Sequence, residues 1–175
     1  IGEIDLNNNE ELLNKPNAVK VLNAIKVSGR TKKGLGIGVF NAITEKTKAT
    51  IKDTITGEIR EEVIEPIANY NVLVLDQQFI SLINTNVTRN GDFRDANVTG
   101  LIFDIFNKKN TYKLYSEVKM STINLADSTS TGFSSSITAR KKSGKFRYSL
   151  KHSYADTKYD INDLGLLQRN NYNNI

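Results

Sequence analysis

The strongest constraint on this chain is a two-residue alternation of apolar and polar side chains over long stretches. From Phe133 to Arg140, apolar or small residues alternate with hydroxyl-bearing and cationic ones. A polar turn at residues 141–144 leads into a second such stretch, from Phe146 to Tyr154. Successive side chains of a β-strand point to opposite faces of the sheet. The pattern therefore predicts an antiparallel hairpin with one apolar and one polar face.

The same alternation recurs around other Lys-rich turns. Residues 25–39 contain two alternating stretches around a Lys-Lys-Gly turn, and residues 101–120 contain two around an Asn-Lys-Lys-Asn turn. Residues 70–75 and 80–87 are apolar enough for strands but alternate less regularly. Their link, residues 76–79, contains neither Gly nor Pro. That is unusual for a tight turn and suggests that residues are missing there.

The start of the chain and one internal stretch do not fit the hairpin pattern. Residues 1–18 are polar and Asn-rich and are predicted as a linker segment, in which residues 10–13 form at most one helical turn, ended by Pro16. Residues 45–68 are predicted as a long excursion between strands. No helical period of convincing length follows, so residues 19–175 are predicted as an all-β domain of about eight antiparallel strands.

Composition excludes several kinds of site. The chain has no Cys and one His, His152, which rules out a disulfide framework and a cysteine nucleophile and argues against His-based catalysis. The glycines of residues 34–38 lack the spacing of a dinucleotide-binding loop. No apolar run approaches the ~18 residues of a membrane-spanning helix. We therefore expect no enzyme: no catalytic residue, no metal site and no cofactor.

Two weaker motifs leave alternatives open. The spacing of Asp160, Asn162 and Gly165 resembles the start of a calcium loop, but Asn171 stands where an EF-hand needs Glu. A calcium site in this loop is the minor alternative to turn hydrogen bonds made by the same side chains. The acidic residues within 58–65 are similarly predicted as solvated charges rather than as the carboxylate pair of a glycosidase.

The charge of the chain is basic, with 24 Lys and Arg against 19 Asp and Glu and a net charge of +5. An excess of basic residues is typical of proteins that bind nucleic acids. The distribution of these residues along the chain decides whether that interpretation applies here. The cations cluster at turns or alternate with apolar residues along strands, and no basic helix or aromatic RNA-binding motif is present. No nucleic-acid partner is expected.

Strand length favours a membrane barrel over a soluble sandwich. Several alternating stretches reach the ~9–11 residues that cross a bilayer obliquely, whereas strands of soluble sheets average nearer ~5–6 residues. Tyr112, Phe146 and Tyr148 lie near turns, where an aromatic girdle is expected. The predicted fold is an antiparallel up-and-down transmembrane β-barrel. A soluble β-sandwich that binds glycans or mediates adhesion remains the alternative.

In a barrel, the polar row faces the lumen and the apolar row faces lipid. The lumen-lining candidates are mostly cationic, which predicts a bias towards anionic or polar solutes: Lys26, Arg30, Lys113, Glu117, Lys119, Arg140, Arg147 and Lys151. The lipid-facing candidates are Leu101, Phe103, Ile105, Leu114, Val118, Phe133, Ile137, Phe146, Tyr148 and Leu150.

Four segments resemble a known family: residues 28–44, 65–72, 85–89 and 159–171. The last is the most specific, and its motif residues are Asn162, Asp163, Leu164, Gly165, Arg169, Asn170 and Asn171. On these segments the chain resembles the outer-membrane β-barrel domain family of unknown function that follows a family-9-like carbohydrate-binding domain in Gram-negative bacteria.

The resemblance implies a place in the bacterial outer membrane and a function as a passage or surface scaffold for polar solutes, related to carbohydrate. The partners it implies are outer-membrane lipid, carbohydrate bound by an upstream domain, and other outer-membrane proteins. The chain ends at Asn173-Asn174-Ile175 without the terminal aromatic residue typical of complete barrels. We therefore expect a fragment of a larger barrel.

Overall fold

The structure, a computed structural model, describes residues 4–164 and 169–175. Over these residues the chain forms twelve β-strands and no helix. Every strand pair is antiparallel. The predicted all-β class is therefore confirmed. In the described ranges, no helix is long and apolar enough to cross a membrane.

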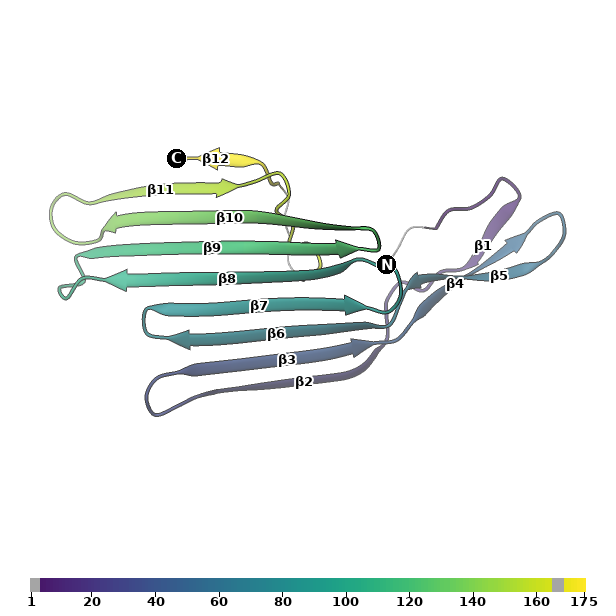
Figure 1. The fold of residues 1–175 in the computed structure, drawn as a ribbon, viewed down its shortest axis with the longest axis horizontal. Coiled ribbons are helices and arrows are strands. Elements are labelled where there is room, and N and C mark those ends of the chain that lie inside the picture. The colour runs from purple at the N-terminus through teal and green to yellow at the C-terminus, as the bar shows by residue number, and fades with distance from the viewer. Residues whose placement is uncertain (1–3, 165–168) are drawn as a thin grey trace.

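Nine strands form one large sheet (Figure 1). Their order across it is β12-β11-β10-β9-β8-β7-β6-β3-β2, so neighbouring strands are consecutive in the chain except for β3 and β6. The strands are β2 (Val21–Arg30), β3 (Gly36–Thr44), β6 (Ala68–Gln77), β7 (Ile80–Arg89), β8 (Asp95–Phe106), β9 (Tyr112–Leu125), β10 (Ser128–Lys141), β11 (Tyr148–Ala155) and β12 (Tyr172–Asn174).

The other three strands form a small sheet, in the order β1-β4-β5, at one end of the large sheet (Figure 1). They are β1 (Glu10–Asn14), β4 (Thr47–Asp53) and β5 (Ile59–Glu65). The predicted excursion at residues 45–68 thus contains the β4–β5 hairpin. The helical turn expected at residues 10–13 is wrong, because these residues belong to β1, inside the predicted linker 1–18. Leu12 lies opposite the fully buried Ile51, so pairing with a distant strand decides the local conformation.

The link between β6 and β7 is a tight turn with no missing residue, contrary to expectation. Gln77 pairs with Ile80, so only Gln78 and Phe79 connect the two strands. Gln78 has a φ of 48°, the left-handed conformation that a tight hairpin turn requires. Because glycine usually supplies this conformation, the sequence pattern gave no sign of the turn.

The two ends of the large sheet differ. In Figure 1 the turns β2–β3, β6–β7, β8–β9 and β10–β11 lie together at the left, which we call the short-turn end. The small sheet, the β7–β8 loop and the segment after β11 lie at the right, which we call the small-sheet end. Most of the buried apolar side chains of the large sheet lie near the small-sheet end, including Val87, Ala96 and Ile123.

The large sheet is open over the described residues. Its strands make extensive contacts only with their hydrogen-bonded neighbours, and no second sheet covers either face in this part of the chain. Strands β2 and β12 are its two edges and do not pair with each other. The antiparallel sheet with sequential hairpins is therefore shown, whereas closure into a barrel is not. The predicted number of about eight strands compares with nine in this sheet and three in the small one.

An ion pair links β1 to β5 within the small sheet. Arg60 on β5 donates from Nε to Glu10 Oε1 at 2.7 Å and from Nη2 to Oε2 at 3.0 Å. The hydrogen bonds from Arg60 and from the Asn7 amide lower the pKa of Glu10 from 4.5 to about 2. Since β1 does not pair with β5, this contact bridges the two outer strands of the small sheet across β4.

Replacing Glu10 by Gln removes this anchor, so we expect β1 to open more often. The ionised Glu10 carboxylate contributes fully to the stability of the β1 contact above about pH 4.5. This stabilisation is lost as the pH falls from there towards 2. Hydrogen exchange of the β1 amides should be faster in Glu10→Gln at about pH 6 and should converge with the wild type near pH 2. Glu11→Gln is the control, because Glu11 lies 3.7 Å from Lys52 at an exposed site. Equal acceleration in the control would contradict the prediction.

Candidate functional site

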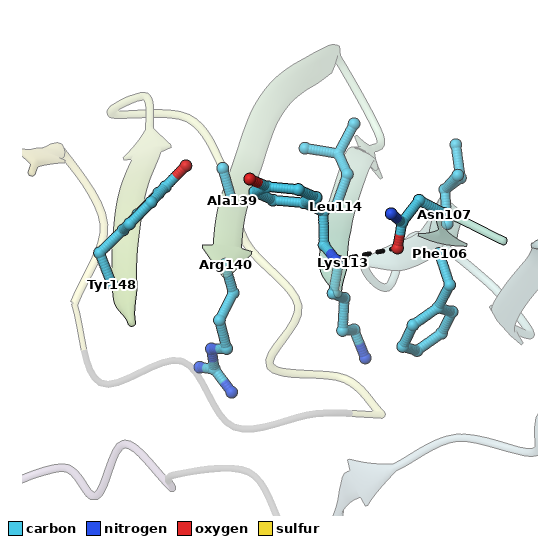
Figure 2. A pocket seen from close by; sticks show the side chains of 9 residues that line it. Phe106, Asn107, Lys113, Leu114, Ala139, Arg140 and Tyr148 are labelled. Atoms are coloured by element: carbon cyan, nitrogen blue, oxygen red, sulfur yellow. Dashed lines mark hydrogen bonds between the residues drawn. The ribbon is translucent and has the colours of Figure 1, made fainter. Parts of the chain in front are cut away.

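The strand register assigns every side chain of the large sheet to one of two faces. Leu82, Leu101 and Val118 lie directly opposite one another on β7, β8 and β9, and they define the Leu101 face. One residue further along, Gly100, Lys119 and Ser134 are aligned in the same way and define the Lys119 face. Figure 2 shows the separation locally: Leu114 and Tyr148 point to one side of the sheet, and Lys113 and Arg140 to the other.

All the predicted lipid-facing residues except Phe146 lie in strands on the Leu101 face. Phe146 lies in the β10–β11 turn, with its ring centroid 6.0 Å from that of Tyr148. The apolar surface continues onto β2, β3, β6 and β7, where exposed apolar residues on the same face include Ile25, Val27, Ile37, Val39, Leu73 and Ile80. The Leu101 face is thus an uncovered apolar surface that extends from β2 to β11.

The Leu101 face changes character towards the small-sheet end. Asn41 donates from Nδ2 to Asn69 Oδ1 at 2.6 Å and to Asn71 Oδ1 at 2.8 Å. Asn84 similarly donates to Thr99 Oγ1 at 2.8 Å. The Asn41 contacts lie beyond the apolar band on the same face, and Asn84 lies at its border, in the row of Leu73 and Met120. They explain the irregular alternation of residues 70–75 and 80–87, because one row of each strand changes from Leu to Asn along its length.

Seven of the eight predicted lumen-lining residues lie on the Lys119 face. They are Lys26, Arg30, Lys113, Glu117, Lys119, Arg140 and Lys151. The eighth, Arg147, lies in the β10–β11 turn. Several are paired: Lys113 Nζ lies 2.9 Å from Asp104 Oδ2, and Lys119 Nζ lies 2.9 Å from Glu117 Oε1. Arg30 pairs with Asp76.

The structure does not bring these charges into one cluster. Lys26 and Arg30 lie on β2, at one edge of the sheet, and the remaining strand residues lie on β9, β10 and β11. Between the two groups the same face carries apolar side chains, which alternation alone did not separate from the lipid-facing row: Phe40, Val72, Val74, Ile83, Val98 and Ile102. The Lys119 face is therefore polar mainly over β9–β11, where the hydroxyls of Ser121, Ser134 and Ser136 also lie.

The segment after β11 folds back over the Lys119 face. The Asp160 amide donates to Ser121 Oγ at 3.0 Å, and Ser121 is fully buried. Tyr159 is 2% exposed and lies against Gly132 of β10. A Cβ atom at Gly132 would lie 2.2 Å from the Tyr159 nitrogen, so only glycine allows this backbone to approach the strand. We call residues 156–164 the inward segment.

Arginines from β7 and the β7–β8 loop hold the inward segment in place. Arg94 Nη2 lies 2.9 Å from Asp160 Oδ2 and 2.7 Å from Asp163 Oδ2, and Arg89 Nη1 lies 2.8 Å from Asp163 Oδ1. Burial would raise the pKa of Asp160, but the Asn162 amide and the Arg94 guanidinium outweigh it and hold that pKa below its usual range. The same pairing leaves both carboxylates facing guanidinium groups, which disfavours the alternative of a calcium site here.

The family-motif residues lie in and just after the inward segment. Asn162, Asp163 and Leu164 belong to it, whereas Gly165 lies outside the described residues. Asn170 donates from Nδ2 to the Thr157 carbonyl at 2.9 Å, and the Asn171 amide donates to the Asp156 carbonyl at 3.1 Å. Arg169 is exposed. The cations that bind the segment are instead Arg89 and Arg94, and their roles were not predicted because they depend on contacts about 70 residues away.

The other residues considered for chemistry have structural contacts. Glu61 and Glu62 on β5 form ion pairs with Lys48 and Arg60, respectively. His152 on β11 lies 2.7 Å from Asn173 Oδ1. Over the described residues, no group of three or more His, Cys, Asp or Glu side chains is arranged to hold a metal ion.

Substitution of Gly132 by Ala should displace the inward segment. Overpacking of this kind costs about 1–3 kcal/mol, so exchange of the Asp160 amide and proteolysis after Lys158 should rise by about five- to hundredfold. Gly29→Ala is the control, because a Cβ at Gly29 meets no atom within 4 Å. Unchanged protection of the Asp160 amide in Gly132→Ala would show that the segment does not lie against β10.

No curated protein and no solved structure matches the chain. The resemblance carried by its four segments is confirmed as far as membership of a family of unknown function. The family match extends over residues 1–175, and the chain belongs to the family described as Domain of unknown function (DUF5916).

Proposed function

We propose that the large sheet is part of the wall of a transmembrane β-barrel in a bacterial outer membrane and serves as a passage or surface scaffold for polar solutes. The observation that carries the proposal is the uncovered apolar band of the Leu101 face, set against a polar, charged Lys119 face. Soluble monomers rarely expose contiguous apolar patches larger than a few hundred Å². A band running from β2 to β11 therefore needs a cover, and lipid supplies one.

The height of the band agrees with a bilayer. On β9 it extends from Tyr112 at the short-turn end to Met120, beyond which the face carries Thr122 and Asn124. Strand residues rise ~3.4 Å each, and barrel strands tilt by ~40°. The band is therefore about 21 Å tall, near the ~25 Å of outer-membrane barrels. Tyr112 and Tyr148 at one border and Phe133 and Tyr154 towards the other suit the two aromatic girdles.

The polar and charged side chains of the Lys119 face support its assignment to the lumen. Lys113, Tyr115, Thr138 and Arg140 line a hollow of about 140 Å³ on this face. Arg140 and Lys151 have no acidic partner among the described residues, which favours anionic or polar solutes. The inward segment crosses the same face at the small-sheet end and would narrow the lumen there. By the usual topology of such barrels, the short turns face the periplasm and the small sheet faces outwards.

The resemblance adds two elements to the proposal. It favours a carbohydrate-related role through a sugar-binding domain upstream of this chain, and it makes outer-membrane lipid and other outer-membrane proteins the expected partners. In this arrangement the small sheet and the β7–β8 loop would lie at the cell surface, where a scaffold would meet its partners.

Extraction of the full-length protein from cells tests the proposal directly. A barrel stays in the membrane fraction after washing with salt and carbonate and needs detergent for release, and it migrates differently on gels before and after heating. A soluble β-sandwich module, the alternative, appears in the aqueous fraction without detergent. Recovery of folded protein in water would therefore overturn the membrane assignment.

Arginine substitutions on one strand test which surface meets lipid. Ile137 on β10 is exposed midway along the apolar band, in the row of Ser116, and Thr129 is exposed beyond the band on the same strand and face. Arg in mid-membrane costs about 2–4 kcal/mol, whereas near the interface it costs about 0–1 kcal/mol. Ile137→Arg should therefore lower the free energy of unfolding in lipid vesicles by about 2–4 kcal/mol. A comparable loss in Thr129→Arg would contradict this placement.

Charge reversal on the Lys119 face tests the selectivity. The double variant Arg140→Glu, Lys151→Glu should shift the reversal potential of reconstituted protein from anion to cation preference, because both side chains face the proposed lumen. The matched control is Lys20→Glu, Lys46→Glu, which changes the net charge equally at the small-sheet end. A cation preference in the wild type would contradict the predicted bias. Absence of any conductance would favour the scaffold over the passage.

A further inference from the structure

The short-turn end carries a concentrated positive charge that the proposed passage does not use. The β8–β9 turn at residues 107–111 and the β10–β11 turn at residues 142–147 lie side by side, and the Lys142 amide donates to the Thr111 carbonyl at 2.7 Å. Neither turn contains an acidic residue. The two turns and the adjoining end of β10 hold six cations: Lys108, Lys109, Lys141, Lys142, Lys145 and Arg147.

These six charges are not neutralised within the described part of the chain. None has an acidic partner there, and five of the residues are exposed. Lys142 Nζ lies 5.2 Å from the centroid of the Phe106 ring, a contact that leaves its charge intact. The nearby acid Asp104 is already paired with Lys113 on the Lys119 face. The cations are therefore available to an anionic ligand.

An apolar groove adjoins the cations on the Leu101 face (Figure 2). It has a volume of about 320 Å³ and is lined by Ile105, Tyr112, Leu114, Ala139 and Tyr148, with Phe106, Asn107, Lys113 and Arg140 at its margin. The small side chain of Ala139 leaves this space, since its cross-strand partners are Leu114 on β9 and Leu150 on β11. Figure 2 shows Tyr148 and Leu114 on either side of Ala139.

The groove and the cations meet at Lys141. Lys141 lies directly between Tyr112 and Tyr148 in one cross-strand row, at the point where the apolar band ends and the turns begin. A ligand seated here would place an apolar chain against Ala139 and an anionic group beside Lys141 and the exposed Lys145 of the adjoining turn, whereas Lys142 reaches Phe106 on the Lys119 face. This is the geometry of an amphiphile at a membrane surface, where basic residues bind anionic lipid headgroups.

We propose that this site binds an anionic phospholipid of the adjoining leaflet, with the headgroup phosphate on the turn cations and an acyl chain in the groove beside Ala139. The inference rests on the proposed membrane location and adds the lipid class that the short-turn end selects. A nucleic acid would need aromatic side chains placed among the cations for stacking. Phe106 and Phe146 do lie among the cations, but a nucleic acid has no apolar chain to occupy the groove lined by Tyr112 and Tyr148.

The test reconstitutes the full-length protein into vesicles of phosphatidylcholine containing about one-fifth phosphatidylglycerol, and spin-labelled versions of the two lipids report which one occupies the protein surface. Each cation near such a surface changes lipid affinity by about fivefold. The double variant Lys141→Gln, Lys145→Gln should therefore lower the preference for phosphatidylglycerol by about fivefold or more. About 1 M salt should lower the wild-type preference as well, because it screens these charges.

Two comparisons identify the site. The double variant Lys20→Gln, Lys46→Gln removes the same charge at the small-sheet end and should leave the preference unchanged. Ala139→Leu fills the groove at constant charge and should lower the preference, provided that its heat-dependent gel mobility shows a folded protein. Equal losses in the two double variants would overturn the proposal in favour of general charge attraction.

Two further results would also contradict it. Competition by inorganic phosphate, without any effect of Ala139→Leu, would show a phosphate site rather than a lipid site. Insertion into the vesicles with no preference between the lipids would overturn this inference alone. Failure to insert into vesicles of either composition would instead contradict the membrane location on which it rests.

Discussion

The long antiparallel ladder of β8, β9 and β10 is the constraint on which the rest of the structure depends. The register runs without a break from Asp95 opposite Asn124 to Phe106 opposite Lys113, and then from Leu125 opposite Ser128 to Tyr112 opposite Lys141. A slip of one residue would exchange the two faces of a strand. The apolar band, the charges of the Lys119 face and the groove at Ala139 all exist because this register is kept over strands of 12 and 14 residues.

Over the residues that the structure describes, the large sheet is a single layer whose two faces have no protein partner across most of its width, apart from the contact with the inward segment. The backbone of the inward segment packs directly against β10 because Gly132 has no side chain. The buried Ser121 hydroxyl accepts a hydrogen bond from the Asp160 amide of the segment. Arg89 and Arg94 then hold its carboxylates from the neighbouring β7–β8 connection. The small-sheet end is thereby the packed end of the sheet, and the short-turn end is the charged, open one.

The parts of the fold that follow from local alternation could be predicted, and the parts that follow from distant pairing could not. The hairpin of β10 and β11 is visible in the sequence because its apolar and polar rows are regular. Strand β1 is not visible, because its conformation comes from pairing with β4 some 40 residues away. Along β7, Leu82 and Asn84 share a face, so the alternation is lost although the strand is regular.

The sequence by itself determined that this chain forms antiparallel hairpins with two unlike faces and contains neither cysteine chemistry nor a histidine cluster. Periodicity assigns a residue to a face, since it depends only on the two-residue repeat of a strand. Tertiary structure alone decided which residues on a face become neighbours. Strand order placed Lys26 and Arg30 far from the β9–β11 charges, left an apolar centre on the Lys119 face, and brought two Lys-rich turns together beside Ala139.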